Sequence, residues 1–336
     1  MRRILTCLYG LMLAGVIVAV DVQGADILNN ERLRFGNGAV DSVNNTGNLQ
    51  GPQYYNPTLA QWRNLTIANN ALVYIVAEGG DGTNGWNNNL GERKDNPVLA
   101  GQVIDTSGFT AYDEGTKGYG TIISVGTTDV NGKTLEIRNT YYLPQNKSYI
   151  RVTTHFRNVS GVAMSNLRYW IGTQDDWLGA TDMPRKEKGN LVGGVFVQIA
   201  DQDTKAKTLR VTCADEGVVF HTDSDKANTL VAGLGMNNIF NKDPVTSAID
   251  TTSDNSYAFY VRLNDLADGA TDQFEWYYIA GPASELADIV ADVDGGVAAL
   301  VGGGRSSPPH PVTGNSTQYF QTWRNRIEQL IQERIN

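Results

Sequence analysis

The chain has 336 residues, with 27 lysines and arginines against 36 aspartates and glutamates, and a formal net charge of −9 at pH 7. This length allows one large domain or two ordinary ones. An acidic surface repels phosphate backbones, so the charge balance argues against nucleic acid as a partner.

Residues 1–24 have the three parts of a secretory signal peptide. Two arginines follow Met1, a mostly apolar run extends from Ile4 to Val20, and Val22-Gln23-Gly24 precedes a predicted cut before Ala25. An uncleaved membrane anchor is the alternative, but the run is shorter than the ~20 residues that a membrane span prefers. We therefore expect a secreted protein, extracellular or at the cell surface, with no membrane span after cleavage and Cys213 as its remaining cysteine.

Residues 25–282 contain short segments with the patterns of β-strands. Leu72–Ala77 is a run of apolar and β-branched residues, which is typical of a buried strand. Apolar and polar residues alternate in Tyr149–Asn158, which predicts a half-buried strand. Turns rich in Gly, Asn, Asp and Ser separate these segments, and no helical period precedes Gly281. The pattern predicts an all-β fold: a large antiparallel β-sandwich, either one supersandwich-like domain or two fused sandwiches.

The most charged stretch of the chain follows this central strand. A strand is predicted for Met164–Ile171, a long loop for Gln174–Asn190 and a further strand for Val192–Ala200. Because long loops mounted on rigid strands often carry function, we expect binding residues in this region.

The C-terminal part is predicted to be helical. Residues 283–304 are expected to form a short helix and a Gly-rich segment, residues 305–316 a Pro/Ser linker, and residues 317–336 an amphipathic helix. The second helix either folds back on the sandwich or joins another copy of the chain or a different partner. Its apolar face, through which the chain would self-associate, consists of Phe320, Trp323, Ile327, Leu330 and Ile331.

The common catalytic patterns are absent from the sequence: it has no nucleophile elbow, phosphate loop, dinucleotide fingerprint or His-Glu-x-x-His motif. His155 shares the polar side of its strand with Arg151 and Arg157. His155 is either a solvated or hydrogen-bonded strand histidine, or the three residues form a concave sheet face that binds an acidic sugar or a carboxylate. In the second case the arginines act as clamps and His155 as acid or base.

Three tryptophans are candidate ligand-binding residues. Trp86, Trp170 and Trp177 lie in or next to polar loops. Exposed aromatic rings of this kind stack on sugar faces or anchor protein interfaces. The alternative is that each ring pins its own loop to the sandwich.

Three aspartates are candidate metal ligands. Asp175, Asp176 and Asp182 could ligate Ca²⁺, which takes oxygen ligands, although acidic loops are more often solvated. No other cofactor is expected.

Parts of the chain resemble known extracellular modules. Phe156-Arg157-Asn158-Val159-Ser160-Gly161, followed by Asn166-Leu167-Arg168-Tyr169-Trp170, is similar to the strand–turn–strand of many β-sandwich modules. Tyr257–Leu263 and Trp276–Gly281 are similar to domains of large secreted surface and adhesion proteins of bacteria. The resemblance implies a surface or matrix role and carries over no functional residues.

Two functions are predicted from these features. The first is a secreted, non-enzymatic β-sandwich protein that acts in cell-surface adhesion or extracellular structural assembly, with a glycan or a protein surface as partner. It is motivated by the signal peptide, the missing catalytic set and the linked terminal helix. The alternative is a carbohydrate-binding module or a carbohydrate-active enzyme of a mutarotase-like or lyase-like kind.

Overall fold

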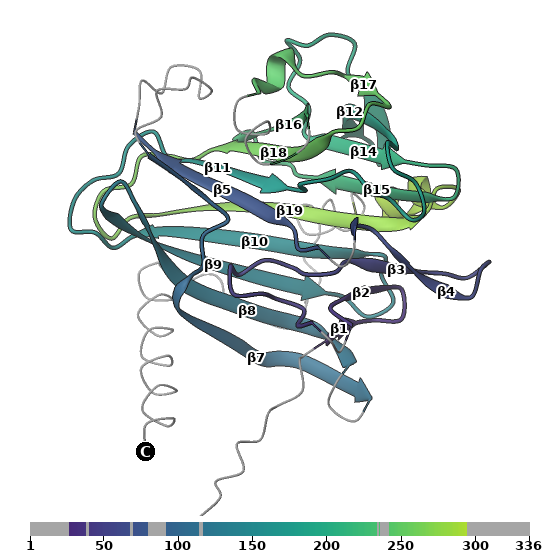
Figure 1. Cartoon of the computed structure of the whole chain (residues 1–336), viewed down its shortest axis with the longest axis horizontal. Coiled ribbons are helices and arrows are strands. Elements are labelled where there is room, and N and C mark those ends of the chain that lie inside the picture. Colours follow the sequence, from purple (N-terminus) through teal and green to yellow (C-terminus); the bar gives the residue numbers. More distant parts are fainter. Residues whose placement is uncertain are drawn as a thin grey trace, which may run out of the picture.

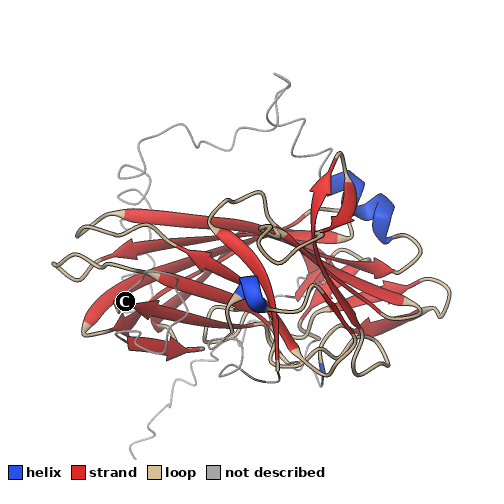
Figure 2. Ribbon diagram, turned by 90° about the horizontal axis from the view of Figure 1, so that it is seen from above, coloured by secondary structure: helices blue, strands red, loops and turns tan. Residues whose placement is uncertain are grey.

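Two β-sheets face each other in a computed structural model, which describes residues 27–37, 40–67, 70–79, 92–113, 117–233, 235 and 242–293 (Figure 1). The larger sheet has 14 strands in the order β13-β12-β14-β15-β19-β10-β9-β8-β1-β2-β3-β4, with β17 beside β12 and β7 beside β8. The smaller sheet has five strands in the order β16-β18-β11-β5-β6. The prediction of an all-β fold is confirmed, and the described strands form one large two-sheet sandwich (Figure 2).

The bounds of the strands are as follows. The larger sheet contains β1 (Ile27–Asn29), β2 (Leu33–Phe35), β3 (Gln53–Asn56), β4 (Gln61–Asn64), β7 (Ala100–Asp113), β8 (Lys117–Val130), β9 (Lys133–Leu143), β10 (Tyr149–Asn158), β12 (Arg185–Val192), β13 (Val195–Gln198), β14 (Thr208–Thr212), β15 (Glu216–His221), β17 (Asp250–Thr251) and β19 (Thr271–Pro282). The smaller sheet contains β5 (Val73–Glu78), β6 (Glu92–Asp95), β11 (Arg168–Gly172), β16 (Ala227–Ala232) and β18 (Ser256–Arg262).

One pairing departs from the predicted antiparallel arrangement. β1 runs parallel to β8, with Leu28 opposite Gly118. The neighbouring pairs, β1 with β2 and β8 with β9, are antiparallel. The parallel pair therefore attaches the N-terminal strands β1–β4 to the rest of the larger sheet.

The core lies between the two sheets. Strand β10 has the bounds that its alternation predicts, and its side chains Ile150, Val152 and Phe156 are buried there. Phe156 packs edge-on against Tyr169 of the smaller sheet, with 5.0 Å between ring centroids. Burial of each such side chain contributes roughly 1.5–3 kcal/mol. Because successive side chains of a strand point to opposite faces, the polar side of β10 is directed away from the smaller sheet.

A helix at residues 286–293 covers part of this outer face, within the segment for which a short helix is predicted. Its side chains Leu286, Val290 and Val293 are buried against Tyr277 and Ile279 of β19. The spacing of the three is that of one helix face. The helix thus leaves the β9–β10 side of the outer face to polar residues.

The predicted loop at Gln174–Asn190 is wrong in its second half. Strand β12 occupies Arg185–Val192, and Lys186 and Lys188 in it are fully buried. Lys186 forms an ion pair with Asp176, and Lys188 donates to the carbonyl oxygen of Pro244, at 2.5 Å. Burial lowers the pKa of Lys188 to about 8. Both lysines have their polar partners within the fold and do not belong to a solvated loop.

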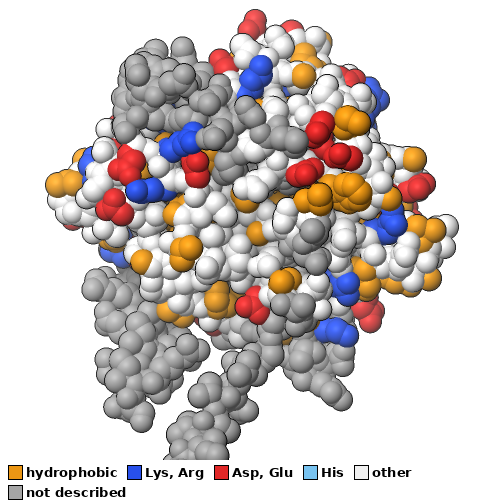
Figure 3. Space-filling model, viewed as in Figure 1, with side chains coloured by type: hydrophobic (Ala, Val, Ile, Leu, Met, Phe, Trp, Pro, Cys, Tyr) orange, Lys and Arg blue, Asp and Glu red, His pale blue; other side chains and the backbone are white. Residues whose placement is uncertain are grey.

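Several predicted segments lie outside the described residues. They are the signal peptide, the linker at 305–316 and the terminal helix at 317–336, including Phe320, Trp323, Ile327, Leu330 and Ile331. Within the described ranges, no helix is both long and apolar enough to cross a bilayer. On the face of the molecule drawn in Figure 3, acidic and basic side chains are interspersed.

Candidate functional site

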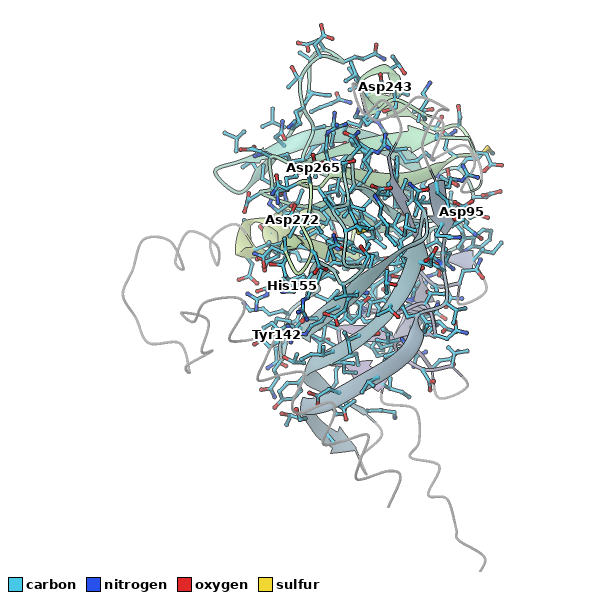
Figure 4. All side chains as sticks on the ribbon, turned by 90° about the vertical axis from the view of Figure 1, so that its left-hand side faces the viewer. Asp95, Tyr142, His155, Asp243, Asp265 and Asp272 are labelled. Carbon is cyan, nitrogen blue, oxygen red and sulfur yellow. The ribbon has the colours of Figure 1, made fainter. Side chains whose placement is uncertain are left out.

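The outer face of β9, β10 and β19 brings the predicted polar residues together. Arg151, His155 and Arg157 project from alternate positions of β10. His155 is directly opposite Arg138 on β9 and Gln273 on β19. We call this surface the His155 face; its members are Glu136, Arg138, Tyr142, Arg151, Thr153, His155, Arg157, Gln273, Glu275 and Tyr277. Figure 4 shows two of its members, Tyr142 and His155, on the same side of the molecule.

Contacts between neighbouring strands order the side chains at one end of the His155 face. The guanidinium carbon of Arg151 lies 5.3 Å from the centroid of the Tyr142 ring. Thr153 Oγ1 donates a hydrogen bond to Glu275 Oε2 at 3.0 Å. The hydroxyl of Tyr277 lies 3.5 Å from the other oxygen of the same carboxylate. The face therefore presents a positioned carboxylate beside a positioned guanidinium and the phenol ring of Tyr142.

His155 is uncharged at neutral pH. Burial, followed by the positive charge of Arg138 on the next strand, lowers the pKa of its imidazole to about 4. Arg138 itself is 3% exposed. A neutral imidazole offers one donor and one acceptor nitrogen, so His155 can bond a hydroxyl group in either direction.

The chemistry of the face suits a sugar that carries a carboxylate. Guanidinium groups bind carboxylates through charge-assisted hydrogen bonds. Glu275 and Gln273 are exposed and supply acceptor oxygens for sugar hydroxyls. The half-buried ring of Tyr142 offers apolar surface of the kind that packs on pyranose rings, whereas the ring of Tyr277 is buried beneath the helix at 286–293.

The predicted tryptophans do not join this face. Trp170 has no exposed surface and packs against Tyr260 within the smaller sheet, so the prediction that it is an exposed ligand-binding residue is wrong. Trp177 is half-buried, and its indole N–H donates to the carbonyl oxygen of Gly179, at 3.1 Å. This bond fits the alternative in which the ring pins its own loop. Trp86 lies outside the described residues.

The loop of Trp177 also lies at the far end of β19. Gly179 is in close contact with Glu216, since a Cβ atom at Gly179 would come within 2.4 Å of its carboxylate. Glu216 pairs with Pro282, whereas His155 pairs with Gln273. These two positions of β19 are about 30 Å apart at the usual rise per residue. The two groups of predicted ligand-binding residues therefore form separate regions.

Asp175, Asp176 and Asp182 do come together. Their nearest carboxylate oxygens lie within 4.8 Å of one another. Asp176, however, is fully buried, is paired with Lys186, and accepts hydrogen bonds from the backbone N–H groups of Met183 and Asn255. One of the three candidate ligands is thus already engaged, and calcium binding at this cluster stays a prediction.

A second polar cluster was not anticipated from the sequence. Glu216 has a side chain 3% exposed, and its Oε1 accepts a hydrogen bond from Arg63 Nε at 2.7 Å. Its Oε2 accepts one from Cys213 Sγ at 3.1 Å. Burial raises the pKa of the Cys213 thiol, which keeps the sulfur protonated and unreactive at neutral pH. The cluster fastens the β3–β4 hairpin to β15 and has a structural role.

The partners of β10 on the His155 face are not among the residues that the sequence predicts for the site. Arg138 and Tyr142 lie on the polar side of β9, and Glu275 and Tyr277 on the outer side of β19. The alternation in both segments contained the signal for which side chains share a face. The alternation does not reveal the register between β9 and β10. It is this register that places Tyr142 opposite Arg151.

Comparisons with known proteins assign no family. No protein-family model matches the sequence, and no curated protein matches it. A galactose mutarotase-like protein from Lactobacillus casei ATCC 334 is 9% identical with a TM-score of 0.42, over 77% of this chain and 100% of that one. A protein provisionally named kojibiose phosphorylase, from the human microbiome, is 10% identical with a TM-score of 0.40, over 81% of this chain.

A third solved structure is similarly distant. A protein from Escherichia coli K12, provisionally named aldose 1-epimerase, is 8% identical with a TM-score of 0.38, over 76% of this chain and 98% of that one. The present chain spans only 32% of the phosphorylase. At these identities and TM-scores the likenesses establish neither a family nor an activity for this chain.

Proposed function

We propose that this protein binds an acidic carbohydrate on the His155 face. The observation that carries the proposal is the convergence of Arg151, His155, Tyr142 and Glu275 from three adjacent strands onto one sheet face. Adjacent strands lie about 4.8 Å apart, so side chains of all three strands reach a ligand of sugar size.

The charges of the face favour an anionic ligand. Arg138, Arg151 and Arg157 carry three positive charges, against the two carboxylates of Glu136 and Glu275, and His155 adds none at neutral pH. The chain as a whole has a formal net charge of −9. The excess of positive charge on the His155 face is therefore opposite in sign to the net charge of the chain. A uronic acid unit supplies both the carboxylate that Arg151 and Arg157 bind and the hydroxyls that Glu275 and Gln273 bind.

Location outside the cytoplasm is part of the proposal. It is motivated by Arg2, Arg3 and the apolar run from Ile4 to Val20, which have the pattern of a secretory signal. Acidic polysaccharides of cell surfaces and matrices would be accessible to the protein there.

The test is binding to immobilised oligosaccharides in matched pairs, each an acidic oligomer and its neutral counterpart. We expect binding to the acidic members, and loss of that binding in Arg151→Ala and Arg157→Ala. Arg32→Ala is the matched control, because Arg32 is exposed and lies outside the His155 face. Equal binding of neutral and acidic members, or equal loss in the control, would refute the proposal.

A further inference from the structure

Strand β13 lies at one end of the larger sheet. β12 and β13 form a hairpin through Gly193 and Gly194, whose φ angles are 58° and 78°. Two residues with positive φ are typical of the type I′ turn that closes a tight hairpin. In the order of strands β13 is terminal, so one of its edges faces no other strand of the described chain.

Other terminal strands carry devices that prevent edge-to-edge pairing. All four residues of β6, Glu92, Arg93, Lys94 and Asp95, are charged. β7 is irregular, with three shifts of register against β8. Charge and bulging of this kind are the usual protection of sheet edges.

Two more terminal strands are covered by backbone from elsewhere in the chain. On β4, the carbonyl oxygen of Asn64 accepts a hydrogen bond from Gly179 N–H at 2.8 Å. On β16, Thr229 N–H donates to the carbonyl oxygen of Ala206 at 2.8 Å. Such cover occupies backbone groups that would otherwise be open to a partner strand.

β13 has none of these devices. The segment 190–200 reads Asn-Leu-Val-Gly-Gly-Val-Phe-Val-Gln-Ile-Ala and contains no charged residue and no proline. The pairing of β12 with β13 is in regular register, without a bulge. Among the described residues, no backbone hydrogen bond reaches the outer edge at Phe196 or Gln198.

The side chains of the hairpin are apolar and exposed. Val192 and Val195 are each 63% exposed, and Val197 is 48% exposed. Phe196, which points to the other face, lies beneath Arg210, whose guanidinium carbon is 4.2 Å from the ring centroid. The Arg210 contact fixes β13 against the sheet and holds the valines outward.

We propose that a second copy of this chain pairs with β13 in antiparallel fashion, so that the larger sheet continues across a two-fold axis. An antiparallel pair of identical strands is self-complementary, because the outward groups of Phe196 and Gln198 in one copy meet the same groups in the other. The valines of the two copies then cover one another.

The uncharged edge is also where two copies of this chain meet with the least repulsion. The chain is acidic, so two copies repel each other over most of their surfaces. Segment 190–200 itself brings no charge to the pairing. The charged side chains beside it are of opposite sign: Arg210 lies over Phe196, and Asp250 is hydrogen-bonded to the Gln198 side chain. The inference does not depend on carbohydrate binding, since β13 and the His155 face are separate parts of the sheet.

The experiment is sedimentation velocity of the full chain over a range of concentrations, together with hydrogen exchange at the same concentrations. We expect a monomer–dimer equilibrium, with amides of Phe196 and Gln198 that become protected as the dimer forms. The double variant Val195→Lys/Val197→Lys should raise the dimer dissociation constant at least ~100-fold, because it places like charges in contact. Val195 and Val197 are exposed in the wild-type monomer, so the double variant should keep the monomer fold.

The matched control is Val98→Lys/Val162→Lys, which changes two valines that are 61% and 54% exposed elsewhere on the chain. It should leave the dissociation constant within about twofold of the wild-type value. A wild-type chain that stays monomeric at every concentration would overturn the proposal. So would a dimer that survives the β13 double variant, or one that the control weakens equally. Protection of β13 by an added unrelated protein but not by a second copy would overturn it as well.

Discussion

Arg151 and Tyr142 lie on neighbouring strands of the larger sheet, with the guanidinium carbon 5.3 Å from the centroid of the phenol ring. The contact orders a positive charge that would otherwise sample many rotamers. A guanidinium over an exposed ring gains about 0.5–1 kcal/mol. Because the contact already restricts the side chain of Arg151, less conformational entropy is lost when the arginine engages a ligand.

Substitutions of this pair should weaken binding to different degrees. Arg151→Ala removes a charge-assisted hydrogen bond and should lower the affinity for an oligouronate about 10- to 100-fold. Tyr142→Leu removes only the ring and should lower it about threefold to tenfold. Titration calorimetry with one oligouronate would measure both, with Tyr55→Leu as control on an exposed tyrosine of β3. Affinities that do not change in the first two variants would contradict the assignment of the site.

His155 should make stability depend on pH in the acid range. Its pKa is about 4 in the folded chain and 6.5 in the unfolded one, so the unfolded chain binds more protons between these values. Stability should therefore fall as the pH decreases from 6.5 to 4, by about 1–3 kcal/mol after allowance for partial exposure. Urea unfolding of the wild type and of His155→Gln at pH 7 and pH 4.5 would measure this loss. If the variant loses as much stability as the wild type, another group is responsible.

The bond between Arg63 and Glu216 should be important for stability. Glu216→Ala removes the carboxylate that Arg63 and Cys213 share and should cost about 3–5 kcal/mol, as is usual when a buried pair loses one partner. Asp225→Ala, in which the removed carboxylate is 91% exposed, should change stability by less than about 0.5 kcal/mol. Chemical denaturation would compare the two. Similar values for both variants would mean that the cluster does not fasten the hairpin.

The buried pair of Lys186 and Asp176 should behave as a unit. Lys186→Met alone leaves an uncompensated buried carboxylate and should cost about 3–5 kcal/mol. Adding Asp176→Asn should recover part of that loss, since the remaining group is then neutral. The double-mutant cycle is measured by urea unfolding. Additive costs for the two substitutions would show that the pair is not coupled.

The strands were largely predictable because their signal is local. The alternation in residues 149–158 predicts both the bounds of β10 and the residues that face the core. The same reasoning fails for β12, because its charged residues predict a solvated loop. Lys186 and Lys188 are buried because Asp176 and the carbonyl oxygen of Pro244 accept their hydrogen bonds, and no local pattern reveals such partners.

The binding site was predictable only on its central strand. Arg151, His155 and Arg157 lie together because alternate residues of one strand share a face. The prediction for Trp170 is wrong because both faces of β11 are buried, and this burial depends on what covers the smaller sheet. Glu216 and Arg63 are separated by 153 positions, so their meeting depends on the topology of the whole sandwich.

The most direct test of the binding account is hydrogen exchange of the full chain with and without a saturating oligogalacturonate. We expect slower exchange in β9, β10 and β19, which together carry the His155 face, and no change in the loop of Trp177. Protection confined to the Trp177 loop or to the β3–β4 hairpin would contradict it. So would an exchange pattern that the oligosaccharide leaves unaltered throughout the chain.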